Sequence, residues 1–306
     1  PPKAIREAIT RAEEAQVLFY RALRTKGQET LNGLSPGEKA IVLISRPYNG
    51  CDSGLNLGLV QKLKKMGVLT IPLDLLPLDE VDISDLGYNM YWRYGQKILK
   101  AARYIRTRGQ GVLYPLYITN FGCGPDSFLM GFFKSEMGGY PCLQIEVDEH
   151  HADAGLVTRC EAFLDSISGY RGKKSVVRSI PKPADRKPLR PIPSASGSFD
   201  KEMIIPYMSD ASYGLAAAFQ ALGIEAQVLP ESDGESLELG KRFSLGKECL
   251  PFVLTLGDFL KVLRRDGFDP GRSAFFMPSA DGPCRFGMYY QRQRQIFDQL
   301  GYGGIT

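Results

Sequence analysis

Residues 40–72 read AIVLISRPYNGCDSGLNLGLVQKLKKMGVLTIP, and this stretch indicates how the chain folds. Its two ends, residues 40–45 and 68–72, are short apolar runs typical of buried strands. Between them, residues 55–66 have the apolar spacing of a helix, which Gly67 closes at the usual glycine position. A strand, a helix and a second strand in this order predict a parallel β-α-β unit.

The same alternation continues on both sides of a tract rich in proline and basic residues. The further elements expected before the tract are helices at 96–107, 125–137 and 154–166 and strands at 112–119 and 142–147. Those expected after it are strands at 203–208, 225–229 and 274–278 and helices at 212–222, 251–264 and 287–300. The pattern predicts an α/β fold with two Rossmann-like (flavodoxin-like) lobes, whose parallel sheets face a cleft between the domains.

The 306 residues are enough for about two domains of ~150 residues each. The expected organisation is an N-terminal helical segment over 1–36, a first lobe over 37–168, a linker over 169–198 and a second lobe over 199–306. In the N-terminal segment, residues 4–26 have the spacing of an amphipathic helix. The second lobe shows only about three strands and the chain begins with Pro1, so we expect a fragment of a longer protein.

Composition narrows the function classes. Hydrophobic residues make up 43% and charged residues 24%, as in ordinary globular proteins. No apolar run is long enough to span a membrane and no signal peptide is visible, so we expect a cytoplasmic protein without a membrane partner. The net charge is +4, but eight basic residues lie in the linker and the remainder is slightly acidic. Because this basicity is not spread over a folded face, we expect no nucleic-acid partner.

Three cysteines share one sequence context, in which glycine and proline lie close to the thiol and a helix follows. Cys123 lies in TNFGCGPDS, Cys249 in GKECLPF and Cys284 in SADGPCRFG. The amide groups and the dipole of a helix N-terminus favour negative charge, so these positions suit a thiolate or an anionic cluster. One cysteine of the first lobe and two of the second could therefore hold one iron–sulfur cluster, with the fourth iron of a 4Fe–4S cubane left open. The alternative is three turn cysteines without a metal.

The remaining cysteines and the two histidines carry weaker signals. Cys142 opens an apolar strand and Cys160 lies within a helix, which favours packing, whereas Cys51 follows the first strand and could reach the cleft. His150 and His151 end the fourth strand and could serve a metal site or acid–base chemistry. The alternative is a turn capped by Asp153 before the next helix.

Several of these stretches resemble one family. RPYN, TNFGCGPDSF, IEVDEHHADAG, GKECLPF and FFMPSADGPCRFG are similar to the large fusion proteins related to 2-hydroxyacyl-CoA dehydratases and their ATP-dependent activases. The resemblance runs from about Ala40 to the end of the chain and leaves out the linker. Related members include double-cubane cluster proteins.

The resemblance implies an oxygen-sensitive iron–sulfur cluster ligated by Cys123, Cys249 and Cys284. It also implies an ATP-dependent activase, as a separate subunit or a fused domain, that delivers a low-potential electron to the cluster. In the dehydratases this electron drives the loss of water from a 2-hydroxyacyl-CoA, so an acyl-CoA substrate and a dimer are expected. Glu248 and His150 are the candidate proton donors, and no activase segment is recognisable in this chain.

Two other readings stay open at this point. One is a reductase of small molecules with a double-cubane 8Fe–9S cluster, for which the six cysteines could supply three ligands to each cubane. The other is a two-lobed α/β module without enzymatic activity, which closes on a ligand or relays electrons.

Overall fold

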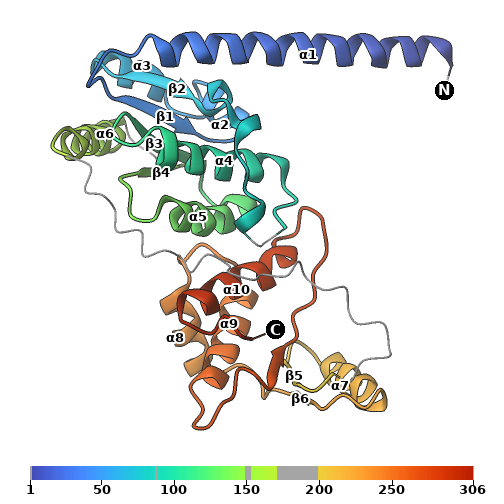
Figure 1. Ribbon diagram of the computed structural model, residues 1–306. Helices are drawn as coiled ribbons and strands as arrows, with labels where there is room; N and C mark the ends of the chain where they lie inside the picture. The colour runs from blue at the N-terminus through green and yellow to red at the C-terminus, as the bar shows by residue number, and fades with distance from the viewer. Residues whose placement is uncertain (1, 87–88, 149–152, 171–198, 306) are drawn as a thin grey trace. The chain divides into compact units, whose positions relative to one another are not determined.

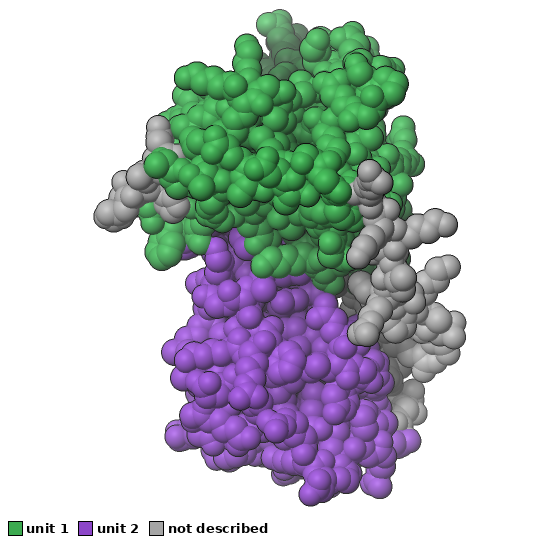
Figure 2. Space-filling view, turned by 90° about the vertical axis from the view of Figure 1, so that its left-hand side faces the viewer, with its two compact units in different colours: residues 1–86, 90–121, 133–177 green, residues 87–89, 122–132, 178–306 purple. Residues whose placement is uncertain are grey.

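The computed structural model describes residues 2–86, 89–148, 153–170 and 199–305, and it confirms the α/β class with an N-terminal helix (Figure 1). Its contacts divide the chain into two compact units, which Figure 2 draws in separate colours. The first unit comprises residues 1–86, 90–121 and 133–177, and the second comprises residues 87–89, 122–132 and 178–306. Each unit contains a sheet of parallel strands. Of the expected linker, residues 171–198 lie outside the described residues.

The sheet of the first unit is made of β1 (Ala40–Ile44), β2 (Leu69–Pro72), β3 (Leu113–Asn120) and β4 (Leu143–Val147). Among the described residues its order is β2-β1-β3-β4, and all neighbouring pairs are parallel. Ile41 of β1 lies opposite Thr70 of β2 and Tyr114 of β3. Every residue of β1 is buried, which is why its sequence is apolar throughout instead of alternating.

The helices that follow these strands are α2 (Pro47–Cys51), α3 (Leu59–Lys65), α4 (Arg93–Arg108), α5 (Gly124–Met137) and α6 (Asp153–Ser168). Short 3₁₀ turns η1 (Leu73–Leu75), η2 (Leu78–Glu80) and η3 (Ser84–Leu86) extend the connection after β2. Helix α3 begins four residues later than the predicted residue 55. Leu57 and Gly58 have φ values of 53° and 63°, and this left-handed backbone is incompatible with a helix that passes through them.

Helix α1 (Lys3–Asn32) is longer than the predicted span of 4–26, and within it only Gly27 is fully buried. A Cβ atom at Gly27 would lie 1.9 Å from the carbonyl oxygen of Leu75, so this close contact requires glycine. Arg24 also forms an ion pair with Asp79. These contacts fasten the C-terminal part of α1 to its own unit.

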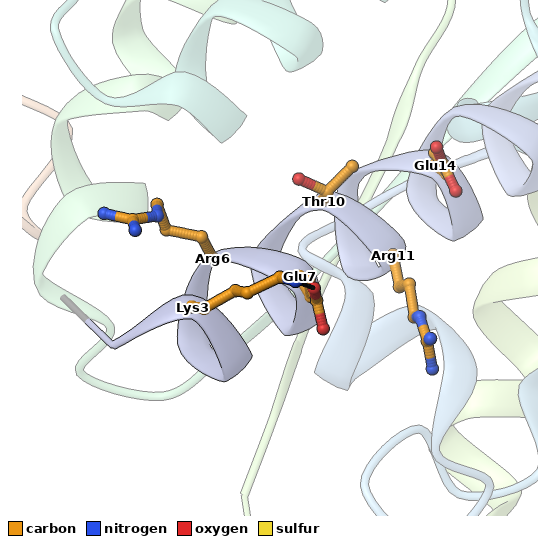
Figure 3. A pocket seen from close by; sticks show the side chains of 6 residues that line it. All are labelled: Lys3, Arg6, Glu7, Thr10, Arg11 and Glu14. Carbon is orange, nitrogen blue, oxygen red and sulfur yellow. Dashed lines mark ion pairs between the residues drawn. The ribbon is translucent and has the colours of Figure 1, made fainter.

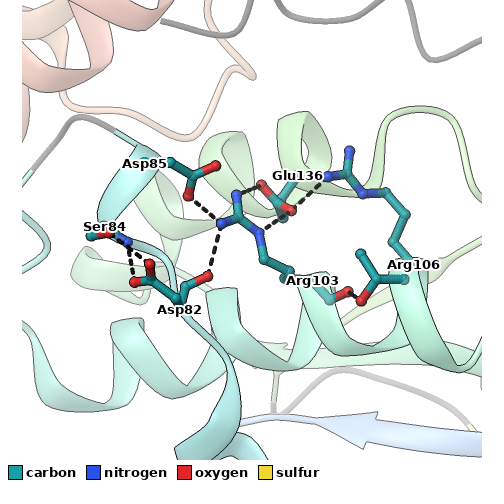
Figure 4. A network of polar contacts seen from close by, with 7 residues as sticks. Asp82, Ser84, Asp85, Arg103, Arg106 and Glu136 are labelled. Carbon is teal, nitrogen blue, oxygen red and sulfur yellow. Dashed lines mark hydrogen bonds and ion pairs between the residues drawn. The ribbon is translucent and has the colours of Figure 1, made fainter.

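A polar network ties α4 to α5 within the first unit (Figure 4). The side chain of Glu136 is 2% exposed and accepts hydrogen bonds from both Nε and Nη2 of Arg103, at 2.9 and 3.1 Å. Arg106 lies 3.0 Å from the same carboxylate, and Arg103 also pairs with Asp85. Such a two-pronged arginine–carboxylate pair fixes the orientation of both side chains.

We expect Glu136→Gln to lower the free energy of unfolding by about 2 kcal/mol, because it leaves two partly buried guanidinium groups without their shared carboxylate. Urea unfolding measures this loss. The matched control is Glu80→Gln, whose partner Arg108 is well exposed in a 3.0 Å surface pair, so a change below about 0.5 kcal/mol is expected. Equal effects at the two sites would contradict the prediction.

The sheet of the second unit is made of β5 (Glu202–Ile205), β6 (Ala226–Val228) and β7 (Ser273–Phe275). Its order within the described residues is β6-β5-β7, again with parallel pairs. The helices of this unit are α7 (Ala211–Ala221), α8 (Gly234–Phe243), α9 (Leu250–Leu263) and α10 (Tyr289–Gln299), with the 3₁₀ turn η4 (Arg285–Met288) directly before α10. Phe259 of α9 stacks on Phe275 of β7 with ring centroids 4.3 Å apart, which joins the helix to the sheet.

Helix α8 is the main element that the sequence analysis missed. Asp233 caps it by accepting a hydrogen bond from the backbone N–H of Ser236 at 2.9 Å, and Ser236 completes the capping box. The helix packs directly against α9. No described helix has the length and apolar character needed to cross a membrane.

Candidate functional site

The three predicted cysteines each stand immediately before a helix. Cys123 precedes α5, Cys249 is the N-cap residue of α9, and Cys284 is the N-cap residue of η4, which leads into α10. The carbonyl oxygen of Cys123 accepts a hydrogen bond from Ser127 N–H at 3.1 Å, and that of Cys249 accepts one from Phe252 N–H at 3.0 Å. The side chains of Cys123 and Cys249 are half-buried and that of Cys284 is exposed.

All three cysteines belong to the second unit, whereas the sequence analysis assigned Cys123 to the first lobe. Helix α5 follows a strand of the first unit, but residues 122–132 group with the second unit and only residues from 133 onward return to the first. The reason lies in the side chains of the first turns of α5, which pack on α9 and α10.

An aromatic cluster, formed by Phe128, Phe252, Phe286 and Tyr289, joins the three helix starts. Phe128, five residues after Cys123, meets Phe252 edge-on with centroids 5.0 Å apart and stacks on Tyr289 at 5.8 Å. Phe252 and Phe286 contact the same tyrosine ring at 5.4 and 5.2 Å. Such aromatic pairs contribute beyond the area they bury. The aromatic cluster therefore connects the three cysteine-bearing turns through one set of packed side chains.

Tyr289 links this core to the thiols. Its hydroxyl is hydrogen-bonded to Sγ of Cys249, and its pKa is raised by burial first, then by the hydrogen bond and charge of Cys249 and by the charge of Cys284. The Tyr289 hydroxyl thus lies within electrostatic reach of two of the three cysteines. The ring is almost completely buried, so the hydroxyl has a fixed position.

Arg285 connects the start of η4 with the start of α5. Its Nη1 donates a hydrogen bond to Oγ of Ser127 at 3.3 Å. A Cβ atom at Gly124 would lie 3.7 Å from Cδ of Arg285, so the side chain of Arg285 lies against the backbone beside Cys123. The arginine also brings a positive charge to this cysteine-bearing region.

Glu248, the predicted proton donor beside Cys249, is only 8% exposed. Its Oε2 accepts hydrogen bonds from the backbone N–H groups of Leu245 and Lys247 at 2.9 and 3.2 Å. Its Oε1 is buried without a hydrogen-bond partner. Leaving a buried carboxylate oxygen without a hydrogen-bond partner costs free energy.

The other predicted residues fall elsewhere. His150 and His151 lie outside the described residues; helix α6 begins at Asp153, three residues after His150. Cys160 is buried in α6, and burial raises the pKa of its thiol to about 11. Burial also raises the thiol pKa of Cys142. Both observations agree with a packing role, because a buried thiol is a weak nucleophile and ligand.

Cys51 is exposed on α2 in the first unit, separate from the three cysteines of the second. Within the part of the chain that the structure describes, no three Cys, His, Asp or Glu side chains form a group that could hold a metal ion.

A second polar feature lies in the first unit, after β1. Asn49 in α2 is fully buried, and neither its Nδ2 nor its Oδ1 has a hydrogen-bond partner. The guanidinium of Arg46, just before it, lies over the ring of Tyr48 at 5.4 Å. The position after β1 is the carboxyl end of a parallel strand, where ligands bind in folds of this class.

Sequence reasoning missed Tyr289, Arg285 and Phe128, although they fall within or beside the motifs around the cysteines. A signal was present, because aromatic residues follow each of the three cysteines within five positions. Spacing alone could not show that these rings meet one another.

Comparison with known proteins gives one match. Residues 1–76 match a family described as a CoA enzyme activase uncharacterised domain. This region runs from α1 to η1 and includes Arg46 and Asn49, but none of the three cysteines. No curated protein and no solved structure matches the chain.

The match supports a relation to the activases. The motifs had suggested this relation together with a more specific one to the dehydratases. The matched region includes α1, which the motif resemblance left out.

Proposed function

We propose that this chain is an iron–sulfur protein of the 2-hydroxyacyl-CoA dehydratase and activase group, which serves ATP-driven electron transfer at low potential to a substrate. Cys123, Cys249 and Cys284 are the proposed ligands of a 4Fe–4S cluster. The observation that carries the proposal is the placement of these thiols at three helix starts that share one aromatic cluster. The activase-related match supports the same functional context.

The donor set fits such a cluster chemically. Thiolates are the usual ligands of iron–sulfur clusters, and the N–H groups at helix starts favour the negative charge of a cluster with its thiolates. Three thiols at three helix starts would supply three of the four ligands of a cubane. When bound, the cluster would accept and pass on one electron, and three protein ligands would leave one iron open.

The surrounding residues have separate roles in this proposal. Glu248 would hold a proton at Oε1, the buried oxygen that has no partner, and His150 is the second candidate proton donor. Tyr289 would fix Cys249 through its hydroxyl. The buried aromatic rings would exclude water from the inner side of the three thiols.

The partners follow from the same context. An activase that hydrolyses ATP would supply the electron, and an acyl-CoA would be the substrate. The feature at Arg46 and Asn49 lies in the activase-related region, where a cation and an unsatisfied amide are suited to an anionic or polar ligand.

The test is purification under strict exclusion of oxygen, with counts of iron and sulfide and optical spectra before and after dithionite. About four irons per chain and a brown colour that reductant bleaches are expected. About eight irons would favour the double-cubane reductase. A colourless protein that also fails to take up iron and sulfide would overturn the proposal in favour of a ligand-binding module.

Tyr289→Phe is expected to lower the reduction potential of the bound cluster and to leave the iron content unchanged. Hydrogen bonds to ligand sulfurs favour the reduced, more negative cluster, and the variant removes the bond to Cys249. A redox titration followed optically measures the shift. Tyr290→Phe is the matched control, since a neighbouring tyrosine loses its hydroxyl but no sulfur contact is affected. An unchanged potential in Tyr289→Phe would contradict the assigned role.

A further inference from the structure

Helix α1 carries an apolar seam with the spacing of a coiled coil. Along it the residues follow one another at intervals of four and three: Ile5, Ile9, Ala12, Gln16, Phe19 and Leu23. A strict alternation of four and three is the signature of helices that pair lengthwise, because it keeps the seam facing one partner. The opposite face carries Lys3, Glu7 and Glu14, with an ion pair between Lys3 and Glu7 (Figure 3).

Only the C-terminal end of this seam is covered by its own unit. Leu23 is half-buried and Gly27 is buried against Leu75, whereas Ile5, Ile9 and Phe19 are 49, 50 and 55% exposed. Figure 1 shows α1 continuing as a straight helix beyond the other elements of its unit. An isolated helix of about 15 residues is marginal in water, so this part of α1 needs a partner along its seam.

We propose that the N-terminal part of α1 pairs with the same segment of a second copy of this chain, in an antiparallel coiled coil over residues 2–19. In this register Ile9 of one copy faces Ala12 of the other, so a large side chain meets a small one. Ile5 faces Gln16, and the two Ile9–Ala12 layers lie at the centre. The overlap is about 27 Å long at 1.5 Å per residue.

Charge favours this pairing of two identical helices. Arg6 and Glu13 each follow a seam residue directly, so they flank the seam on the same side, seven residues apart. Antiparallel pairing places Arg6 of each copy beside Glu13 of the other, which forms two attractive contacts. Neither residue has an ion pair within the described part of the chain. A parallel pair would place both residues opposite the small residues on the other flank, Ala8 and Ala15, and would gain nothing from charge.

The geometry also leaves room for the second copy. The ring of Tyr20 already lies 5.4 Å from Nζ of Lys97 in its own unit, so the free seam ends at Phe19. Antiparallel pairing then places the first units of the two copies at opposite ends of the helix pair. The alanines at 8, 15 and 22 on one flank of the seam allow the two helices to approach closely.

Sedimentation equilibrium of the full chain over a range of concentrations tests the proposal. We expect a dimer whose dissociation constant rises about tenfold in Arg6→Glu and in Glu13→Arg, because each variant turns two attractions into repulsions. The double variant Arg6→Glu/Glu13→Arg restores the attraction and should return to the original dissociation constant.

Matched controls are Arg11→Glu and Glu14→Arg, which make the same charge changes away from the seam and should leave the dimer unchanged. Ile9→Asp should give a monomer. A monomeric original chain at every concentration would overturn the proposal, and so would a dimer that survives Ile9→Asp. The pairing does not depend on the proposed cluster, so either can fail alone.

Discussion

Cys249→Ser is expected to lose most of the iron that the oxygen-free preparation contains, and its brown colour with it. A serine oxygen replaces the sulfur that would bind iron, and a cluster held by only three protein ligands tolerates the loss of one poorly. Cys249 begins α9 and is fixed by Tyr289, so the serine side chain would occupy the same place without a shift of the backbone. Cys123→Ser and Cys284→Ser should behave alike, because each would remove one of the three proposed ligands.

Cys142→Ser is the matched control, since that half-buried cysteine lies in the first unit and should keep its full iron content. Cys51→Ser separates the two cluster types: a loss of about half of the iron would show a second cubane that uses the first unit. Full iron content in all three variants of the second unit would contradict the ligand assignment. Circular dichroism of each variant distinguishes a lost cluster from a lost fold.

The central strands of the first sheet, β1 and β3, were predictable because they are buried along almost their whole length. In β1 every position is buried, so its sequence AIVLI is apolar throughout and predicts a buried parallel strand. The start of α3 was not predictable in the same way, since the apolar pattern continues through Leu57, whose backbone is left-handed. Helix α8 is only ten residues long and mostly polar, and Asp233 with Ser236 marks its start.

The positions of the three cysteines before helices could be predicted from proline and glycine nearby. Their common environment could not, because it depends on contacts between distant residues. Tyr289 lies 40 positions from Cys249, and Phe128 meets Phe252 across more than a hundred residues. The grouping of Cys123 with the second unit follows from these contacts and from no feature of its own motif.

Gly257→Ala is expected to destabilise the second unit severely, by about 3 kcal/mol or more. A Cβ atom at Gly257 would lie 1.8 Å from the carbonyl oxygen of Ser236, and one at Gly240 would lie 1.9 Å from that of Val253. Helices α8 and α9 therefore meet backbone to backbone at two reciprocal glycines, and an added methyl group must push the helices apart. Urea unfolding measures the loss of stability.

Gly214→Ala is the control, because a Cβ atom at that position in α7 meets nothing within 4 Å. Alanine in a helix interior should leave the protein unchanged or stabilise it by up to about 1 kcal/mol.

The iron content of any Gly257→Ala protein that still folds is a second measurement of the same contact. Since α9 begins at Cys249, a displaced α9 moves that thiol away from Tyr289 and from the other two helix starts. Reduced iron content in the folded fraction is therefore expected, and a folded variant with full iron content and unchanged stability would show that the α8–α9 contact does not position Cys249.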